Sequence, residues 1–307
     1  MKLTPRLLSL LVPLAVLLAP AVARAQIQPP PIQPPQPIVI PETERVLWSV
    51  PGSAYLQIRT RLWTTTRQWS YSTHWSAIGV AGNRLLWQRT DTGETNLWKL
   101  DDAGNYVSHA ALTTPGPAYR ARSITLANTF VGSCYDRRDT QRYHVLWVDN
   151  AGAMVLDLVE GSGLRNASYV VDPLAGVTQP TAVVGVYAAL GGPQMLTHVT
   201  PAGQTARFEI RFLNWTGTRF TANSVAAQYN LASGYVPVSM NARESSVDGW
   251  TDQVFTRVSV GSGSLWNIGW DRTPPSTGPY WIGETFYPYP SQGWQAKAHT
   301  VNPAMCP

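Results

Sequence analysis

Residues 85–100 read LLWQRTDTGETNLWKL. Two apolar runs flank the segment Thr-Asp-Thr-Gly-Glu, and a glycine-containing turn between two such runs is typical of a β-hairpin. Glycine is expected there because tight hairpins require positive φ angles, which glycine adopts without strain. Nothing in the stretch has the pattern of a catalytic motif, so it informs the architecture of the protein and leaves its ligand open.

Four further stretches repeat this pattern of an apolar run, a turn with a glycine and a second, partly alternating run. They cover residues 46–58, 145–158, 195–210 and 254–268. The turn glycines of the five copies are Gly52, Gly93, Gly152, Gly203 and Gly263. The copies recur about every 40 to 60 residues, a period typical of propeller blades.

Strand-like segments flank most of the hairpins. Segments rich in small residues precede four of them, at 76–82, 122–128, 181–187 and 236–242. Other strand-like segments follow four of them, at 106–112, 168–172, 219–226 and 280–287. Four antiparallel strands per repeat correspond to one propeller blade, whose innermost strand needs small side chains near the axis. Adjacent pairs such as Leu86-Trp87 point to opposite faces of a strand, so both faces of each sheet are expected to be covered.

The two ends of the chain complement each other. The hairpin at 46–58 has no leading strand before it, whereas residues 293–306, GWQAKAHTVNPAMC, resemble a leading strand with no hairpin after it. We therefore expect the C-terminal strand to complete the N-terminal blade and close the ring, which removes exposed sheet edges. The predicted fold is all-β: a five-bladed β-propeller of four-stranded antiparallel blades over residues 44–307. A β-sandwich is the alternative, but it does not explain the complementary ends.

The N-terminal residues have the pattern of a secretory signal peptide followed by a spacer. Residues 1–25 combine a basic start, an apolar run and the Ala23-Arg24-Ala25 site of a secretory signal peptide of bacterial type. Cleavage after Ala25 would place the protein in the periplasm or outside the cell, with no membrane span left. Residues 26–43 are rich in proline and predict a stiff leader, with recognition of a partner domain as the alternative.

The net charge bears on whether the protein binds nucleic acid. The formal net charge is +5, and removal of the signal lowers it by three to +2 because Lys2, Arg6 and Arg24 leave with it. A nucleic-acid partner is not expected, since no basic stripe is visible.

Cys134 and Cys306 both follow predicted innermost strands, so they fall in equivalent loops on one face. An oxidising compartment favours their pairing as a disulfide.

The sequence offers little that resembles an active site. Glycoside hydrolases need paired carboxylates near the axis, and the predicted leading strands contain no Asp or Glu. Loop carboxylates remain as a third option, namely Asp136, Asp139, Glu244, Asp248 and Asp252. The five histidines are scattered without metal-ligand spacing. We expect a protein that is not an enzyme and that uses no cofactor and no metal.

One aromatic position repeats at or just before the leading strands. The residues are Trp75, Tyr119, Tyr235 and Trp294, with Gln179 at the corresponding place in the remaining unit. These rings could wedge between neighbouring blades as part of the core. They could instead line equivalent pockets, where a flat ring suits the apolar face of a sugar and several weak sites gain by avidity.

The repeat count, the Trp-rich hairpins and the pair Gly293-Trp294 together resemble the five-bladed secreted propellers of the tachylectin-2 and tectonin-like lectins. The resemblance is architectural, because no binding motif of that family is matched. It implies binding of a carbohydrate or cell-surface glycan. A protein-interaction scaffold is the alternative, and an enzyme that uses loop carboxylates is the third. A lectin predicts similar sites in several blades, whereas a scaffold predicts one large apolar patch. The oligomeric state stays open.

Overall fold

The structure is a computed structural model that describes residues 43–60, 64–127, 142–172, 181–189, 192–244, 249–258, 262–271, 280–288, 290 and 293–302. The chain divides into two compact units, Met1–Ile38 and Val39–Pro307, and every described residue belongs to the second. The predicted signal peptide at 1–25 and all of the leader except residue 43 lie outside the described residues. Gln179, Cys134 and Cys306 also lie outside them.

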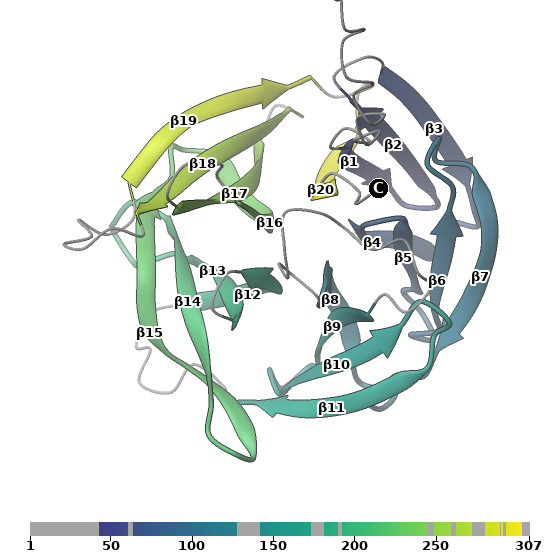
Figure 1. Ribbon diagram of the computed structural model, residues 1–307, viewed down its shortest axis with the longest axis horizontal. Coiled ribbons are helices and arrows are strands. Elements are labelled where there is room, and N and C mark those ends of the chain that lie inside the picture. Colours follow the sequence, from purple (N-terminus) through teal and green to yellow (C-terminus); the bar gives the residue numbers. More distant parts are fainter. Residues whose placement is uncertain are drawn as a thin grey trace, which may run out of the picture. The chain divides into compact units, whose positions relative to one another are not determined.

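All regular secondary structure in the described residues is β-strand. The strands are β1 Thr43–Val50, β2 Ser53–Arg59, β3 Thr64–Ser70, β4 Trp75–Ala81, β5 Arg84–Arg89, β6 Thr95–Leu100, β7 Tyr106–Leu112, β8 Arg120–Leu126, β9 Arg142–Val148, β10 Met154–Glu160, β11 Arg165–Val171, β12 Thr181–Ala189, β13 Gly192–Val199, β14 Arg207–Trp215, β15 Arg219–Asn230, β16 Tyr235–Glu244, β17 Gly249–Val258, β18 Gly263–Asp271, β19 Tyr280–Tyr287 and β20 Gln295–Asn302 (Figure 1). The five hairpins expected from the sequence are therefore present.

The strands form several antiparallel sheets. Three have four strands each, in the orders β4-β5-β6-β7, β16-β17-β18-β19 and β20-β1-β2-β3. The fourth sheet has eight strands, because the groups β8–β11 and β12–β15 are joined along their outer strands. That junction is a short parallel pairing in which Val170 and Val171 of β11 lie opposite Arg219 and Phe220 of β15.

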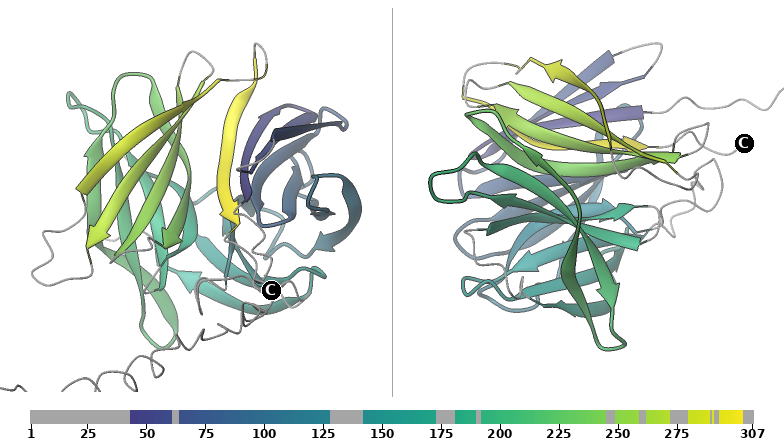
Figure 2. Two further views of the ribbon diagram at one scale, coloured as in Figure 1. Left: turned by 45° about the horizontal axis from the view of Figure 1, so that its top comes forward. Right: turned by 90° about the vertical axis from the view of Figure 1, so that its left-hand side faces the viewer.

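The two ends of the described unit meet in one sheet. Strand β20 pairs antiparallel with β1, from Thr43 opposite Asn302 to Ser49 opposite Gln295, with a register shift between Leu47 and Trp48. Figure 2 shows the C-terminal strand in yellow beside the N-terminal strands in purple. This pairing confirms the predicted completion of the first sheet by the C-terminal strand.

The first strands of the five groups contact one another in a cycle. Strand β20 lies against β4, β4 against β8, β8 against β12, β12 against β16, and β16 against β20. Small residues allow this close approach. A Cβ atom placed on Gly79 of β4 would lie 3.1 Å from Ile124 of β8, and one on Gly185 of β12 would lie 2.6 Å from the Cβ of Ser123. The predicted preference for small side chains in these strands thus has a direct steric reason.

The Leu-Trp pairs cover both faces of their sheets, as predicted. Leu86 and Trp87 are both fully buried but belong to different core clusters. Leu86 packs with Tyr143 and Trp147, whereas Trp87 packs with Leu47 on the other side. Because each sheet buries apolar side chains on both faces, neighbouring sheets share their cores.

The role expected of Gly263 is wrong. The turn glycines Gly52, Gly93, Gly152 and Gly203 have positive φ angles, but Gly263 does not. It is the first residue of β18, where a side chain would collide with the ring of Phe255 and lie 3.3 Å from Trp48. Glycine is required there for close packing and not for turn geometry.

Candidate ligand-binding site

The four aromatic residues singled out in the sequence lie in four separate core clusters. Trp75 and Trp294 are only 7% and 9% exposed. Trp294 packs edge-on against Tyr55, with ring centroids 5.9 Å apart. Tyr119 and Tyr235 are half-buried against their own clusters. The structure therefore does not bring the four rings together.

The burial of Trp75 and Trp294 has the geometry expected of a wedge between sheets. A sugar that stacks on an aromatic ring needs one free face of that ring, and little surface of either tryptophan is accessible. A ligand role for these two residues, and for Tyr119 and Tyr235, stays a prediction.

Tyr71 is the exposed ring next to Trp75, and sequence reasoning missed it. Its side chain is 39% exposed. The Tyr71 ring stacks on Trp87 with centroids 5.5 Å apart and an interplanar angle of 27°. It also meets the edge of Trp75 at 5.0 Å and tilts against Trp98 at 5.5 Å. Its backbone N–H donates to the carbonyl of Gly52 at 2.6 Å, which holds the residue in place after β3.

A second exposed ring extends this arrangement. Tyr106, at the start of β7, is 46% exposed and meets Trp98 edge-on at 4.9 Å. Its hydroxyl lies 2.7 Å from Nδ1 of the exposed His109. Tyr71, Trp98 and Tyr106 thus form a continuous row in which a buried tryptophan supports two accessible tyrosines. We call these three residues the aromatic row.

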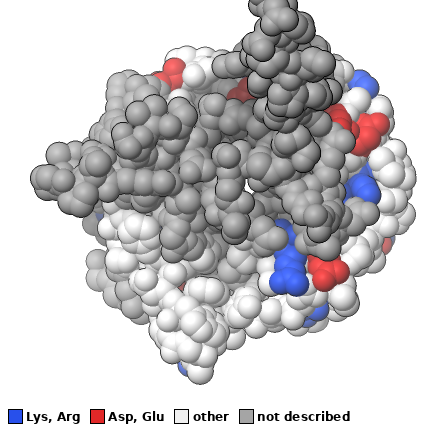
Figure 3. All heavy atoms as spheres, in the orientation of Figure 1, with Lys and Arg blue, Asp and Glu red and all other residues white. Residues whose placement is uncertain are grey.

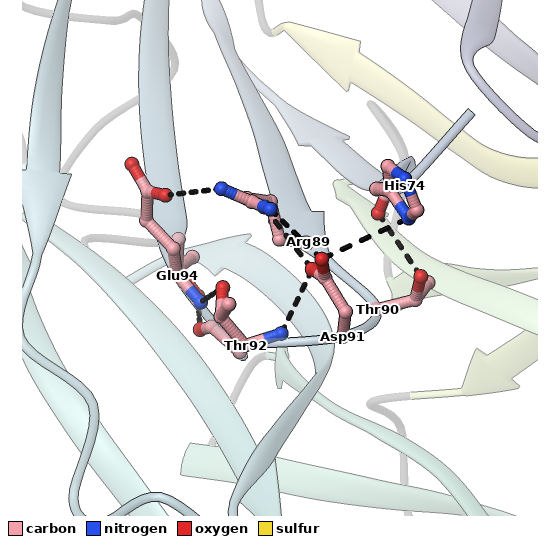
Figure 4. A network of polar contacts seen from close by, with 8 residues as sticks. His74, Arg89, Thr90, Asp91, Thr92 and Glu94 are labelled. Atoms are coloured by element: carbon pink, nitrogen blue, oxygen red, sulfur yellow. Dashed lines mark hydrogen bonds and ion pairs between the residues drawn. The ribbon is translucent and has the colours of Figure 1, made fainter. Parts of the chain in front are cut away.

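A polar network occupies the β5–β6 turn, as Figure 4 shows. The guanidinium of Arg89 donates from Nη2 and Nε to Asp91, at 2.8 and 3.1 Å, a two-point contact that fixes both side chains. Nη1 of Arg89 lies 3.6 Å from Glu94, and Nδ1 of His74 lies 3.7 Å from Asp91. The hydroxyl of Thr90 donates to the carbonyl of His74 at 3.0 Å, which ties the turn to the chain before β4.

Hydrogen bonds between Arg89 and Asp91 favour the charged form of both side chains. The hydrogen bonds from Arg89 lower the pKa of Asp91 to about 2, and the backbone N–H of Thr92 adds to the lowering. The hydrogen bond to Asp91 in turn raises the pKa of Arg89. A fixed carboxylate is therefore present at all pH values at which the protein is expected to work.

The aromatic row and the polar network share one face of the β4–β7 sheet. Trp87 and Arg89 are two residues apart on β5 and so point to the same face. Arg89 also lies directly opposite Trp75 of β4. Tyr71 contacts both Trp75 and Trp87, the two residues that neighbour Arg89 on this face. The polar network therefore adjoins the Tyr71 end of the aromatic row. Exposed rings beside fixed donors and acceptors are a combination that suits a polyhydroxylated ligand.

A second feature is a cavity at the centre of the cycle of first strands. It is small, with enclosed room for about one water molecule. Its lining, residues 78–81, 122–125, 187, 238–241 and 297–300, comes from all five first strands. We call it the axial cavity. The described lining contains the cations Arg122 and Lys297 and no carboxylate.

The loop carboxylates considered in the sequence lie partly outside the described residues. Asp136, Asp139 and Asp248 lie outside them. Glu244 and Asp252, expected in a loop, lie in β16 and β17 instead, because this hairpin extends further than its apolar residues indicate. Within the described ranges, no group of three or more His, Cys, Asp or Glu side chains could hold a metal ion.

A partly buried polar network joins the first and last described strands. Glu44 of β1 accepts hydrogen bonds from Nε2 of His299, at 2.8 Å, and from the hydroxyl of Tyr287. Arg59 lies 4.0 Å from the same carboxylate. Burial raises the pKa of Glu44, but the hydrogen bond and charge of His299, with help from Tyr287 and Arg59, outweigh it and lower the pKa. This network links β1, β19 and β20, so we assign it to the structure of the closing sheet.

Few charged side chains lie on the described part of the face that Figure 3 shows. Figure 3 shows basic and acidic side chains interspersed on the described part of one face, without a continuous basic stripe. No helix in the described part of the chain is long and apolar enough to span a membrane.

Comparison with known proteins does not name a family. No family model matches the chain, and no curated protein matches it. A protein of unknown function from Bacteroides caccae aligns with a TM-score of 0.38 and 9% identity, over 86% of this chain and 99% of that one. A mutant of AofleA from Arthrobotrys oligospora, with three arginines changed to alanine, aligns with a TM-score of 0.35 and 10% identity, over 84% and 74%. At these values neither similarity assigns a function.

Proposed function

We propose that residues 43–302 form a five-bladed β-propeller. The proposal is supported by the five groups of four antiparallel strands, which the short β11–β15 pairing only joins at one edge. It is also supported by the closed cycle of contacts among β20, β4, β8, β12 and β16. In a propeller these strands would be the innermost ones, and the β20–β1 pairing would close the ring.

We further propose that the protein is a secreted or periplasmic, non-enzymatic binding protein whose ligand is a carbohydrate or cell-surface glycan. The observation that carries the proposal is the exposed ring of Tyr71, held by Trp87 and Trp75 beside the ionised Asp91. A ring that is already supported from below loses little conformational freedom when a sugar stacks on it.

The residues around Tyr71 have distinct roles in this proposal. The exposed rings of Tyr71 and Tyr106 would stack on apolar faces of successive sugar units. Asp91 uses some of its acceptor positions for Arg89 and the N–H of Thr92 and keeps capacity for a sugar hydroxyl. Glu94, whose carboxylate is about half exposed, would accept from another hydroxyl. Arg89 positions both carboxylates.

The test is binding of the mature protein to a glycan array, followed by the Tyr71→Ala variant on any glycan that binds. Phe286→Ala is the matched control, because Phe286 is an aromatic residue with 60% exposure on β19, outside the site. We expect Tyr71→Ala to weaken binding by about tenfold or more, which corresponds to a loss of about 1.4 kcal/mol or more. Unchanged binding by a folded Tyr71→Ala protein would remove Tyr71 from the site.

A protein-interaction scaffold is the second candidate, and one observation favours it. The adjoining strands β11, β14 and β15 carry several exposed apolar side chains, among them Val170, Phe212, Trp215 and Val225. Trp215 is 50% exposed and packs against Tyr169 and Phe220. Trp215→Ser should leave glycan binding unchanged, whereas loss of a protein partner with this variant would support the scaffold function.

A further inference from the structure

The turn between β5 and β6 carries an excess of negative charge. Two carboxylates, those of Asp91 and Glu94, face the single guanidinium of Arg89, which donates to Asp91 and lies 3.6 Å from Glu94. The hydrogen bond to Asp91 raises the pKa of Arg89, and the charges of both carboxylates add to the rise despite some desolvation. His74, whose Nδ1 lies 3.7 Å from Asp91, is positive only when it is protonated. The network therefore has a net charge of −1 when His74 is neutral.

A second guanidinium approaches this turn from the side of β8. A Cβ atom placed on Gly93 would lie 2.9 Å from Nη1 of Arg120. The same nitrogen donates to the carbonyls of Pro117 and Tyr119, at 2.8 and 3.0 Å. Tyr119 packs in the core cluster on the face of the β4–β7 sheet opposite to that of Trp87. Arg120 is thus held by backbone oxygens beside the other face, and the face with the aromatic row keeps its negative charge.

The carboxylate of Glu94 is the more available of the two acceptors. Its side chain is 51% exposed, and its contact with Arg89, at 3.6 Å, is too long for a good hydrogen bond. Asp91, in contrast, already accepts from Arg89 and from the N–H of Thr92. The carbonyl of Glu94 accepts from the N–H of Arg89 at 2.8 Å, so the two residues face each other across the hairpin. An unsaturated, exposed carboxylate therefore lies at the Tyr71 end of the aromatic row.

An exposed tyrosine ring beside an exposed carboxylate is suited to an ammonium group. The face of an aromatic ring is negative and attracts a cation placed above it. A carboxylate accepts a charge-assisted hydrogen bond from the same cation. A ligand with a carboxylate or sulfate group meets the opposite condition, because it brings a further negative charge beside Asp91 and Glu94 and gains no partner for it. The charge of the turn therefore selects among glycans.

We propose that the aromatic row and the β5–β6 turn prefer glycans built from amino sugars whose amino groups are free and therefore cationic. This inference rests on the proposed function, since the sugar ring still stacks on Tyr71, and it names the class of glycan. The ammonium group lies between the carboxylate of Glu94 and the ring of Tyr71, and a neighbouring hydroxyl donates to Asp91. Neutral N-acetylated glycans bind more weakly, and acidic glycans bind most weakly.

The first experiment measures binding of three oligosaccharides of equal length to the mature protein by calorimetry. They are an oligomer of glucosamine, the same oligomer fully N-acetylated, and an oligomer of a uronic acid, at a pH at which the free amines are protonated. We expect the free amine to bind about threefold or more tightly than its N-acetylated form, the range of an exposed ion pair. This preference should shrink at high salt, which screens exposed charges.

The outcomes separate this inference from the proposed function. Equal affinities for the three oligosaccharides, or a uronic acid oligomer that binds as tightly as the N-acetylated one, overturn the inference and leave glycan binding intact. Binding of other glycans on the array without binding of the free amine also overturns the inference alone. If no glycan of any charge binds, the proposed function fails and the inference fails with it.

Matched variants assign the preference to Glu94. Glu94→Gln keeps the shape of the side chain and removes its charge, so the ratio of the affinities for the free amine and its N-acetylated form should fall by about threefold. Glu160→Gln is the control, because it removes the same charge from β10 in another sheet and should leave this ratio unchanged. Glu94→Lys should reverse the order and favour the uronic acid oligomer. A ratio that is the same in Glu94→Gln and Glu160→Gln overturns the inference.

A linear diamine tests whether the positive charge alone is sufficient. It presents ammonium groups without a ring that could stack on Tyr71, so we expect it to compete only weakly with the glucosamine oligomer. Competition as strong as that of the unlabelled oligomer would make the turn a general cation site and would overturn the assignment to amino sugars.

Discussion

We call the boundary between two neighbouring sheets a seam. Two seams, from β3 to β4 and from β19 to β20, have an aromatic pair at the same place in the repeat, but the tyrosine is exposed at one and buried at the other. At the first seam, Tyr71 follows the outer strand β3 and covers Trp75 with a ring that is 39% exposed. At the second, Tyr287 ends the outer strand β19 and is only 3% exposed in the cluster that contains Trp294. The hydroxyl of Tyr287 donates to Glu44, whereas the Tyr71 ring adjoins the charged turn at Arg89. A repeated aromatic position therefore becomes an accessible surface at one seam and part of the closure at the other.

The cause of the difference is the strand that follows each tyrosine. After Tyr71 the chain continues directly into β4, which already belongs to a complete sheet. After Tyr287 it enters β20, which must pair with β1 from the other end of the unit. The second seam therefore needs contacts that hold two chain ends together, and the Glu44, Tyr287 and His299 network supplies them. The first seam has no such demand and leaves its tyrosine accessible.

The largest expected effect comes from removing the closing strand. Deletion from Gly293 onward takes away β20, exposes the edge of β1 and leaves the first strands β4 and β16 without their neighbour. Exposed strand edges pair with other molecules, so we expect aggregation or failure to fold. Solubility and a melting curve check this. A soluble truncated protein with an unchanged melting temperature would contradict closure by β20.

Alanine variants at the two seams compare a wedge with an exposed ring. Trp294→Ala should lower the free energy of unfolding by about 3–5 kcal/mol, because it opens a cavity in a core where the tryptophan is 9% exposed. Tyr71→Ala should lower it by only about 1 kcal/mol, since much of this ring faces solvent. Urea unfolding of both variants provides the measurement. Equal losses would mean that Tyr71 is as much a structural wedge as Trp294.

A disulfide would strengthen the second seam and not the first. Cys306 comes four residues after the end of β20, and Cys134 follows β8. We predict that they pair, with a stabilisation of about 2–4 kcal/mol that reducing agent abolishes. Thiol titration of the unfolded, unreduced protein is the check. Two free thiols per chain would leave the closing strand held by its pairing and side chains alone.

The smallest effect is a pH dependence of the closing network. The pKa of Glu44 is lowered in the folded protein, so its contribution to stability is complete above its unfolded value of 4.5 and is lost as the pH falls through the lower folded value. Glu44→Gln should lower the free energy of unfolding by about 1–2 kcal/mol at pH 7 and less at pH 3. Urea midpoints across this range test it.

Local patterns in the sequence were sufficient for much of the fold. The hairpins were predictable because a glycine turn between apolar runs is a property of consecutive residues. Strand β3 was not among the predicted strands, because its sequence TTTRQWS is mostly polar and its side chains alternate between exposed and half-buried. The parallel junction of β11 and β15 was also unpredictable, since two pairs of residues far apart in the chain leave no periodic signal.

For the candidate site, the sequence determined that an aromatic residue recurs at the start of the first strands, and only the tertiary structure decided which rings remain accessible. Trp75 and Trp294 are the residues that recur in the sequence, and both are buried. The accessible ring next to Trp75 is instead Tyr71, four residues before it. In the same way, Arg122 and Lys297 are 175 positions apart in the sequence and share one cavity because β8 and β20 both flank β4. Exposure and charge balance depend on which strands lie side by side, and that arrangement is a property of the folded chain rather than of any local stretch.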